Sequence, residues 1–294
     1  MATIPPHATL IKPSAIYAYF DKIQFWLQEP IDRRKVAQLR KQCGRGGVFV
    51  QNGPARFNAR YRQRVEFRQP TDQALRWLAQ REDALINRAE IALDSVFDYR
   101  ADRDEAWEFL HRHLVRRWHG TKQEIRVYRT EPQAPSLDDD GTSGTRYDAG
   151  RSAPNLTALY RQECSRITGE LNCLHLEWRL NGLKTVRGVG IQSGHDLPEF
   201  DHRQFWQKRL LLFAADKERL GRLINNQLKG RKSRISKTET RGRYRINIDQ
   251  RMGDVHVRAR ETVQELIDDL GPSYRIHRAL IPISNEVLLP DGGR

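Results

Sequence analysis

The feature that most constrains the fold is a pair of short segments, residues 88–94 and 173–180, in which polar and apolar side chains alternate. Successive side chains of a β-strand point to opposite faces. Each segment is therefore predicted to form a strand with an apolar face toward a core and a charged face on the other side. The charged positions are Arg88, Glu90 and Asp94 in the first segment and His175, Glu177 and Arg179 in the second.

The remaining segments show strand or helix periodicity. Strands are predicted at residues 16–27, 48–50, 61–67, 124–128, 146–151 and 155–161, and residues 275–283 are predicted to be extended. Helices are predicted at residues 32–42, 104–118, 202–226 and 262–270, and Thr71 is placed to cap a further helix. Strands clustered in the middle of the chain predict an α+β fold with a mainly antiparallel central sheet, helices packed on one face and a basic C-terminal appendage.

The charge of the chain indicates a polyanionic partner. The 294 residues carry a formal net charge of +14 at pH 7, and each phosphate that a basic side chain neutralises releases counterions. Nucleic acid is the leading candidate, and an anionic membrane surface is the rival. No apolar run approaches the length of a membrane span and the first residues do not resemble a signal peptide, so we expect no membrane partner.

The three cysteines, Cys43, Cys164 and Cys173, are odd in number and include no Cys-x-x-Cys pair. This pattern is typical of a reducing compartment, and it argues against a disulfide framework or a structural zinc site. We therefore expect a cytoplasmic protein.

A chain of this length has room for one large domain with a small appendage. We expect a flexible leader at residues 1–14, a domain at 15–227 with a mobile polar loop at 131–146, and a basic segment at 228–294. Within that segment, residues 229–260 hold eleven basic and three acidic residues, a net charge of +8. This stretch is the best candidate for contact with duplex phosphates, and a solvated linker is the alternative.

Arginines on the polar face of the predicted strand 61–67 point to the same partner. Together with the basic stretch, the residues expected to contact nucleic acid are Arg62, Arg64, Arg231, Lys232, Arg234, Arg241, Arg243 and Arg245.

The two charged strand faces carry groups that can do chemistry. The carboxylates of Glu90, Asp94 and Glu177 are hard oxygen ligands of the kind that Mg²⁺ and Mn²⁺ prefer. His175 can serve as a base or a ligand, and Arg179 can stabilise a charged transition state. The alternative interpretation is a solvated sheet face with charge pairs.

Tyr160 is a candidate nucleophile on the predicted strand 155–161. A phenol has a pKa near 10, so attack on a phosphodiester needs a base, a metal or nearby arginines. Arg151, Arg161 and Arg179 are plausible neighbours in the sequence pattern. A structural tyrosine at the rim of the core is the alternative.

Four motifs, in this order, resemble a known family. They are Arg-x-Glu-Ile-Ala-Leu-Asp at 88–94, Gly-Arg-Ser at 150–152, Leu-Tyr-Arg at 159–161 and His-Leu-Glu-Trp-Arg-Leu-Asn-Gly at 175–182. Together they resemble the replication initiation proteins of rolling-circle plasmids and filamentous-type phages, in particular the staphylococcal plasmid Rep proteins and the phage replication initiation factors. That family shows an acidic strand, a glycine–basic–serine turn, a tyrosine segment and an R-x-E strand in the same order.

The resemblance implies a metal-dependent DNA nickase–ligase. Such an enzyme binds a replication origin, cuts one strand, stays joined to the 5′ phosphate through a tyrosine, leaves a 3′ hydroxyl for a polymerase and rejoins the strand. The resemblance implies that Tyr160 is the nucleophile, with Tyr147 and Tyr128 as alternatives. Arg151, Arg179 and His175 complete the predicted catalytic residues. The implied ligands of Mg²⁺ or Mn²⁺ are Glu90, Asp94 and Glu177.

The implied partners are origin DNA, both as duplex and as the nicked single strand, a host helicase and polymerase, and a second copy of the chain in a homodimer. The chain departs from the family in that Glu90 replaces an aspartate and His175 stands at the arginine of R-x-E. Two other functions fit the same features. One is a non-catalytic, sequence-specific DNA-binding protein of the repressor or partition type, and the other is a basic RNA-binding protein with aromatic stacking.

Overall fold

The computed structural model describes residues 10–44, 47–116, 125–128 (backbone only), 145–148, 153–216, 218–223, 226, 262–267 and 276–290. The chain divides into two compact units. The larger, which we call the sheet unit, comprises Ile11–Trp107, Gln123–Gln207 and Val287–Arg294, and the smaller comprises Met1–Leu10, Glu108–Lys122 and Lys208–Glu286. The basic stretch 229–260 lies outside the described residues.

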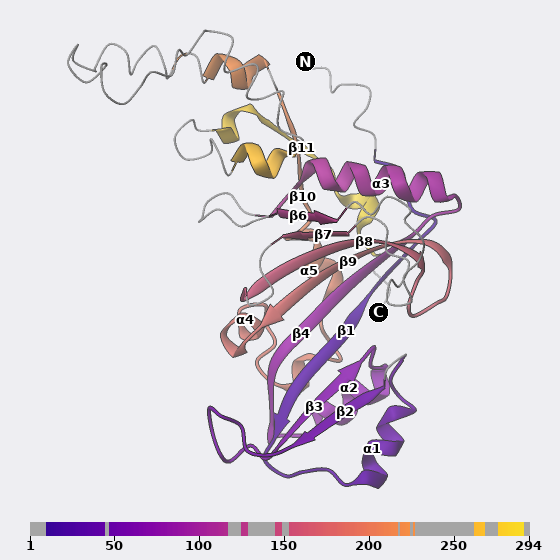
Figure 1. Cartoon of the computed structure of the whole chain (residues 1–294), viewed down its shortest axis with the longest axis vertical. Coiled ribbons are helices and arrows are strands. Elements are labelled where there is room, and N and C mark those ends of the chain that lie inside the picture. Colours follow the sequence, from indigo (N-terminus) through magenta and orange to yellow (C-terminus); the bar gives the residue numbers. More distant parts are fainter. Residues whose placement is uncertain are drawn as a thin grey trace, which may run out of the picture. The chain divides into compact units, whose positions relative to one another are not determined.

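The sheet unit is built on an eight-stranded sheet in the order β2-β3-β1-β4-β9-β8-β7-β6 (Figure 1). All neighbouring strands run antiparallel, which confirms the predicted α+β fold with a mainly antiparallel sheet. The strands are β1 (Ala15–Leu27), β2 (Val48–Asn52), β3 (Gln63–Arg68), β4 (Ala84–Val96), β6 (Ile125–Tyr128), β7 (Thr145–Asp148), β8 (Asn155–Cys164) and β9 (Leu171–Asn181).

The two segments with alternating polar and apolar residues, 88–94 and 173–180, lie side by side in β4 and β9. In their register, Glu90 pairs with Arg179 and Asp94 pairs with His175. All the charged positions of both strands therefore share one face of the sheet, as the period of two requires. The apolar positions, such as Ile91 and Leu176, are buried on the opposite face.

Strand β1 contains a bulge that changes which residues face the charged side. Phe20 pairs with Ile91 of β4, and Lys22 pairs with Glu90, so Asp21 is an extra residue with no partner of its own. A bulge of this kind bends the strand and re-aims a side chain. Consecutive residues Asp21 and Lys22 thereby both reach the charged face.

Helices cover the apolar face of the sheet. In α2 (Asp72–Ala79), the Trp77 ring packs against Phe25 and Phe67, and in α5 (His202–Gln207), the Phe205 ring packs against Trp178. Helix α1 (Arg33–Arg40) begins at Asp32, whose side chain accepts a hydrogen bond from the backbone of Lys35. The shorter helical elements are α4 (Leu183–Arg187), η1 (Gly194–Asp196) and η4 (Glu286–Leu288).

The smaller unit contains a three-stranded sheet in the order β11-β10-β5. Its strands are β5 (Leu114–Val115), β10 (Leu211–Ala215) and β11 (Leu280–Ile283), and the helical turn η3 (Ile276–Ala279) precedes β11. Its described core consists of Val115, Leu220, Val263, Leu266, Ile267, Ile276, Ala279 and Leu280.

Two helix predictions are wrong in this region. The single helix predicted at 202–226 is instead α5, strand β10 and a second helical segment, and the helix predicted at 104–118 is α3 (Arg100–His113) followed by β5. In both places apolar residues at helical spacing are drawn into strand pairing, because Leu212 pairs with Leu114 on one side and with Ile283 on the other. Tertiary pairing overrides local helical periodicity here.

The other predictions on this part of the chain have mixed outcomes. Most of the polar loop predicted at 131–146 lies outside the described residues, and β7 begins at Thr145. The extended segment predicted at 275–283 is confirmed only for β11. None of the helices in the described part of the chain is long and apolar enough to cross a membrane.

Candidate active site

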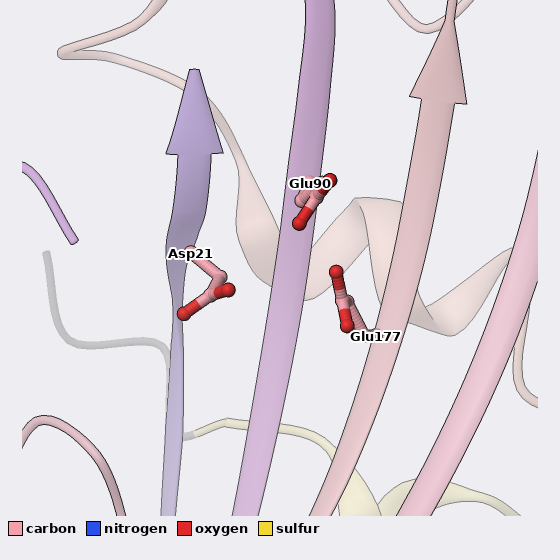
Figure 2. A group of neighbouring side chains, drawn as sticks. All are labelled: Asp21, Glu90 and Glu177. Atoms are coloured by element: carbon pink, nitrogen blue, oxygen red, sulfur yellow. The ribbon is translucent and has the colours of Figure 1, made fainter. Parts of the chain in front are cut away.

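Three buried carboxylates meet on the charged face of the sheet. Asp21 of β1, Glu90 of β4 and Glu177 of β9 each offer an oxygen atom, and these atoms lie within 4.8 Å of one another. Figure 2 shows them on three neighbouring strands, with Glu90 in the middle and its carboxyl group close to that of Glu177. They are only 6%, 1% and 2% exposed, so their charges are poorly solvated. We call these three residues the carboxylate cluster.

Glu90 and Glu177 form a hydrogen-bonded carboxyl pair. Burial and the neighbouring charge of Glu177 raise the pKa of Glu90. Burial would also raise the pKa of Glu177, but the hydrogen bond from Glu90 and the Arg179 guanidinium outweigh it and hold this pKa well below its ordinary value. The pair is therefore asymmetric, because the carboxyl group of Glu90 binds its proton more tightly than that of Glu177 does. Lys22 Nζ, 2.9 Å from Glu90 Oε2, and the Arg88 guanidinium complete its surroundings.

Arg179 connects the carboxylate cluster to Tyr160. Its Nε and Nη2 atoms donate to the two oxygens of Glu177 at 2.8 and 2.9 Å, and Nη2 also donates to the Tyr160 hydroxyl at 2.8 Å. The Tyr160 hydroxyl in turn donates to the Tyr147 hydroxyl at 3.2 Å. Burial, together with the charge of Glu177, raises the pKa of Tyr160, whereas Arg179 opposes this rise. The phenol is thus held neutral, with its oxygen fixed between an arginine and a second tyrosine.

Asp94 belongs to a second group on the same face. His175 Nδ1 lies 2.6 Å from Asp94 Oδ1, and Ser165 Oγ donates to Asp94 Oδ2 at 2.6 Å. Burial would lower the pKa of His175, but the Asp94 carboxylate outweighs it and raises this pKa. The other ring nitrogen, Nε2, lies 4.0 Å from Glu177 Oε2. His175 therefore links Asp94 to the carboxylate cluster, and the two carboxylates that flank its ring raise its pKa.

The structure brings Glu90 and Glu177 together but does not place Asp94 with them. Residues four apart along a strand are separated by about 13 Å, so Glu90 and Asp94 lie at different levels of the same face. The third carboxylate near Glu90 comes from Asp21 instead. Metal binding by these residues stays a prediction, as does the catalytic role of Tyr160, Arg179 and His175.

Sequence reasoning missed Asp21 because strict alternation assigns it to the core. Residues Ile23, Phe25 and Leu27 face the core, so the same phase in β1 would bury Asp21 among apolar side chains. In this phase, Asp21 is a charged residue at a position expected to face the core, and Phe20 is an apolar residue at a position expected to face solvent. These two consecutive mismatches indicate a bulge.

Gln69 holds the bulge in place. Its backbone N–H donates to the Asp21 carbonyl at 2.8 Å, and its Nε2 donates to Asp21 Oδ1 at 3.0 Å. Gln69 has a φ of +46°, a conformation that few non-glycine residues adopt. Gly44 is required beside it, because a Cβ at this position would overlap the Gln69 side chain.

Arg166 is a second residue that the sequence did not indicate. It follows β8, and its guanidinium lies 3.9 Å from Asp21 Oδ2. Burial opposes its charge, but the carboxylates of Asp21 and Glu177 outweigh this and raise the pKa of Arg166. Its side chain is 39% exposed, so a positive charge at the rim of the carboxylate cluster is accessible to solvent.

The remaining predicted site residues divide into two sets. Arg62 is exposed and Arg64 is half-buried, at or just before the start of β3. The other predicted positions lie outside the described residues, namely Arg151, Arg231, Lys232, Arg234, Arg241, Arg243 and Arg245. The side chain of Tyr128 is not described either.

Comparisons with known proteins add one distant likeness. No protein-family model matches the chain, and no curated protein matches it. Among solved structures, the chain is similar to the rolling circle replication initiator protein from Geobacillus stearothermophilus, at 10% sequence identity and a TM-score of 0.36. The match covers 63% of this chain and 80% of that one. At this TM-score the likeness carries no argument about the site or the activity.

Proposed function

We propose that the chain is a rolling-circle replication initiator that nicks and rejoins one strand of origin DNA through a tyrosine, with the aid of a divalent cation. The observation that supports this most is the carboxylate cluster, joined through Arg179 to the Tyr160 hydroxyl. The order of the four sequence motifs supports the same function. A host polymerase would extend the 3′ hydroxyl that the nick leaves, and a host helicase would unwind the duplex.

The residues present fit Mg²⁺ or Mn²⁺. Asp21, Glu90 and Glu177 supply only oxygen ligands, which these ions prefer. Burial and the charge of Glu177 raise the pKa of Glu90, so a cation bound between the two carboxylates would relieve their repulsion. When bound, the ion would polarise the scissile phosphate and stabilise the negative charge that develops on it. In this proposal Asp21 takes the place that the sequence assigned to Asp94.

In the proposed reaction, the Tyr160 oxygen attacks the phosphorus atom and the bond from phosphorus to the 3′ oxygen breaks. The tyrosine is then joined to the 5′ phosphate, and the 3′ oxygen takes up a proton and leaves as a hydroxyl. The proton of Tyr160 passes to the Tyr147 hydroxyl, which releases its own proton to solvent, and solvent supplies the proton that the 3′ oxygen takes up. Attack by the 3′ hydroxyl on the phosphotyrosine reverses these steps and rejoins the strand.

Three arginines would neutralise the phosphate during this transfer. Arg179 already donates to the attacking oxygen, Arg166 lies beside Asp21 with part of its side chain in solvent, and Arg151 is the third by sequence pattern. A guanidinium near a developing negative charge stabilises the transition state more than the ground state. His175 is a positioning residue in this proposal, because it contacts Glu177 and Asp94 rather than the reacting atoms.

The test uses supercoiled plasmid that carries the DNA flanking the gene, with Mg²⁺ or Mn²⁺. We expect nicked circles and a protein–DNA adduct that resists SDS, and we expect Tyr160→Phe and Glu177→Gln to abolish both. An adduct that survives Tyr160→Phe but not Tyr147→Phe would move the nucleophile to Tyr147. Specific binding without nicking by either metal would refute the proposal in favour of a repressor or partition protein.

A further inference from the structure

Four aromatic side chains lie at the β2–β3–β1 end of the sheet unit, and we call them the aromatic platform: Trp26, Phe49, Phe57 and Tyr61. The ring of Phe57 contacts those of Trp26 and Tyr61, with centroids 5.8 and 5.7 Å apart. Phe49 and Phe57 are 49% and 56% exposed. Single exposed rings are common on protein surfaces, but here three rings contact one another and the fourth, Phe49, lies against the Arg68 guanidinium.

The aromatic platform shares its sheet face with the carboxylate cluster. Lys22 pairs with Glu90 on one side and with Arg68 of β3 on the other, so all three side chains lie on the charged face. Trp26 is four residues beyond Lys22 in the same strand and therefore points the same way. Phe49 of the edge strand β2 also lies on this face, in contact with Arg68. The side chains of Glu90, Lys22, Arg68 and Phe49 thus follow one another across this face from β4 to β2. Figure 1 shows the order of these strands in the sheet.

Two arginines accompany the rings, and one of them, Arg68, also pairs with Glu66 at 3.1 Å. The Arg68 guanidinium lies over the Phe49 ring, 4.3 Å from its centroid, and Arg64 pairs with Trp26 across the strands. The strand register places Phe49 two strands and two residues away from Trp26, so the backbones of these two residues are about 12 Å apart. Flat apolar rings separated by cations match a ligand in which flat bases alternate with phosphates.

We propose that the aromatic platform binds the unpaired bases of single-stranded DNA beside the scissile phosphate, while Arg64 and Arg68 bind its phosphates. This inference rests on the proposed function, which requires a strand that crosses this face to reach Tyr160. Bases in a duplex are stacked on one another and cannot place a face against Phe49 or Phe57. The aromatic platform therefore favours the unpaired strand over the duplex, a distinction that phosphate contacts alone cannot make.

The experiment measures binding of the full chain to fluorescein-labelled oligo(dT) by anisotropy, in EDTA so that no cleavage occurs and at one fixed salt concentration. A duplex, an oligo(rU) and an abasic oligonucleotide of the same length are the comparison probes. The variants are Phe49→Ala, Phe57→Ala and Phe49→Trp. Tyr99→Ala is the matched control, because Tyr99 is 70% exposed at the start of α3 and outside the aromatic platform.

We expect Phe49→Ala and Phe57→Ala each to weaken oligo(dT) binding about tenfold, the size of one lost base stack. Phe49→Trp and Tyr99→Ala should bind as the wild type does. Duplex and abasic binding should be unchanged in every variant. Equal weakening for duplex or abasic probes, or no weakening of oligo(dT) binding, would overturn the inference, and tighter binding of oligo(rU) than of oligo(dT) would reassign the aromatic platform to RNA.

Failure of this inference and failure of the proposed function give different results. Binding is measured without metal, whereas nicking is not. Glu177→Gln should abolish nicking and leave oligo(dT) binding intact. If the wild type does not nick DNA but Phe49→Ala still weakens oligo(dT) binding as expected, only the catalytic proposal is refuted and the inference about the aromatic platform holds.

Discussion

Removal of the Arg179 side chain should make the stability of the chain depend on pH in a defined way. In the wild type, the guanidinium pairs with both oxygens of Glu177, which is 2% exposed. Without the guanidinium, the buried Glu177 carboxylate must bind a proton when the chain folds. The ordinary pKa of this carboxyl group is 4.5. Its protonation at pH 7 therefore costs about 3 kcal/mol, because each pH unit above the pKa adds about 1.36 kcal/mol.

The pH dependence follows from the sign of the shift. In Arg179→Ala, the pKa of folded Glu177 lies above its unfolded value, so the variant loses stability as pH rises. The wild type has a depressed pKa at Glu177 and shows no such loss between pH 5 and pH 7 from this group. The difference in the free energy of unfolding between the wild type and Arg179→Ala should therefore decrease by about 1.4 kcal/mol for each unit of pH below 7.

Urea unfolding in EDTA at pH 5.5 and pH 7, followed by fluorescence, measures this difference. Arg76→Ala is the control, since Arg76 forms an exposed pair with Asp72 and its loss should change stability at neither pH. A loss below about 1 kcal/mol at pH 7, or a loss of equal size at both pH values, would refute the assignment of a charged Glu177 held by Arg179.

Three further predictions concern the site. An Mn²⁺ concentration one hundred times its dissociation constant should stabilise the chain by about 3 kcal/mol in thermal unfolding, and Asp21→Asn should remove most of this gain; an undiminished gain would show that Asp21 is no ligand. Asp94→Asn should cost about 3–5 kcal/mol in urea unfolding because His175 loses its carboxylate. The raised pKa of His175 makes that cost largest below about pH 6.5 and smaller above it, so a cost that grows with pH would contradict the pairing. Gly44→Ala should lower stability by about 1–3 kcal/mol, because the new Cβ overlaps the Gln69 side chain; unchanged urea unfolding would mean that Gln69 moves without cost.

The sheet could be predicted from the sequence because its strands obey local rules. The alternation in β4 and β9 identified both strands and the face that carries Glu90, Glu177 and Arg179. The segments around β5 and β10 could not be predicted in the same way. Their apolar residues satisfy a helical pattern, and only pairing between residues almost one hundred positions apart, such as Leu114 with Leu212, decides for strands.

The carboxylate cluster was predictable only in part, for a related reason. Glu90 and Glu177 follow from alternation, but their contact depends on the register between two strands, which alternation does not give. Asp21 depends on a break in alternation, and the residue that stabilises the break, Gln69, comes from after β3. The burial of Glu90 and Glu177 also does not follow from the charged composition of this face, which by itself predicts solvent exposure.

The bulge in β1 makes this strand tolerant of a change that would ruin a regular strand. Deletion of one residue normally moves every side chain beyond it to the wrong face. Deletion of Asp21 would instead remove the bulge. Phe20, Lys22 and Ile23 would then alternate without interruption, and each would keep its present face of the sheet. The chain can therefore lose this carboxylate by deletion and still form the same sheet, which circular dichroism of the deletion variant would reveal. The acid at position 21 is thus an insertion that the alternation of β1 does not require.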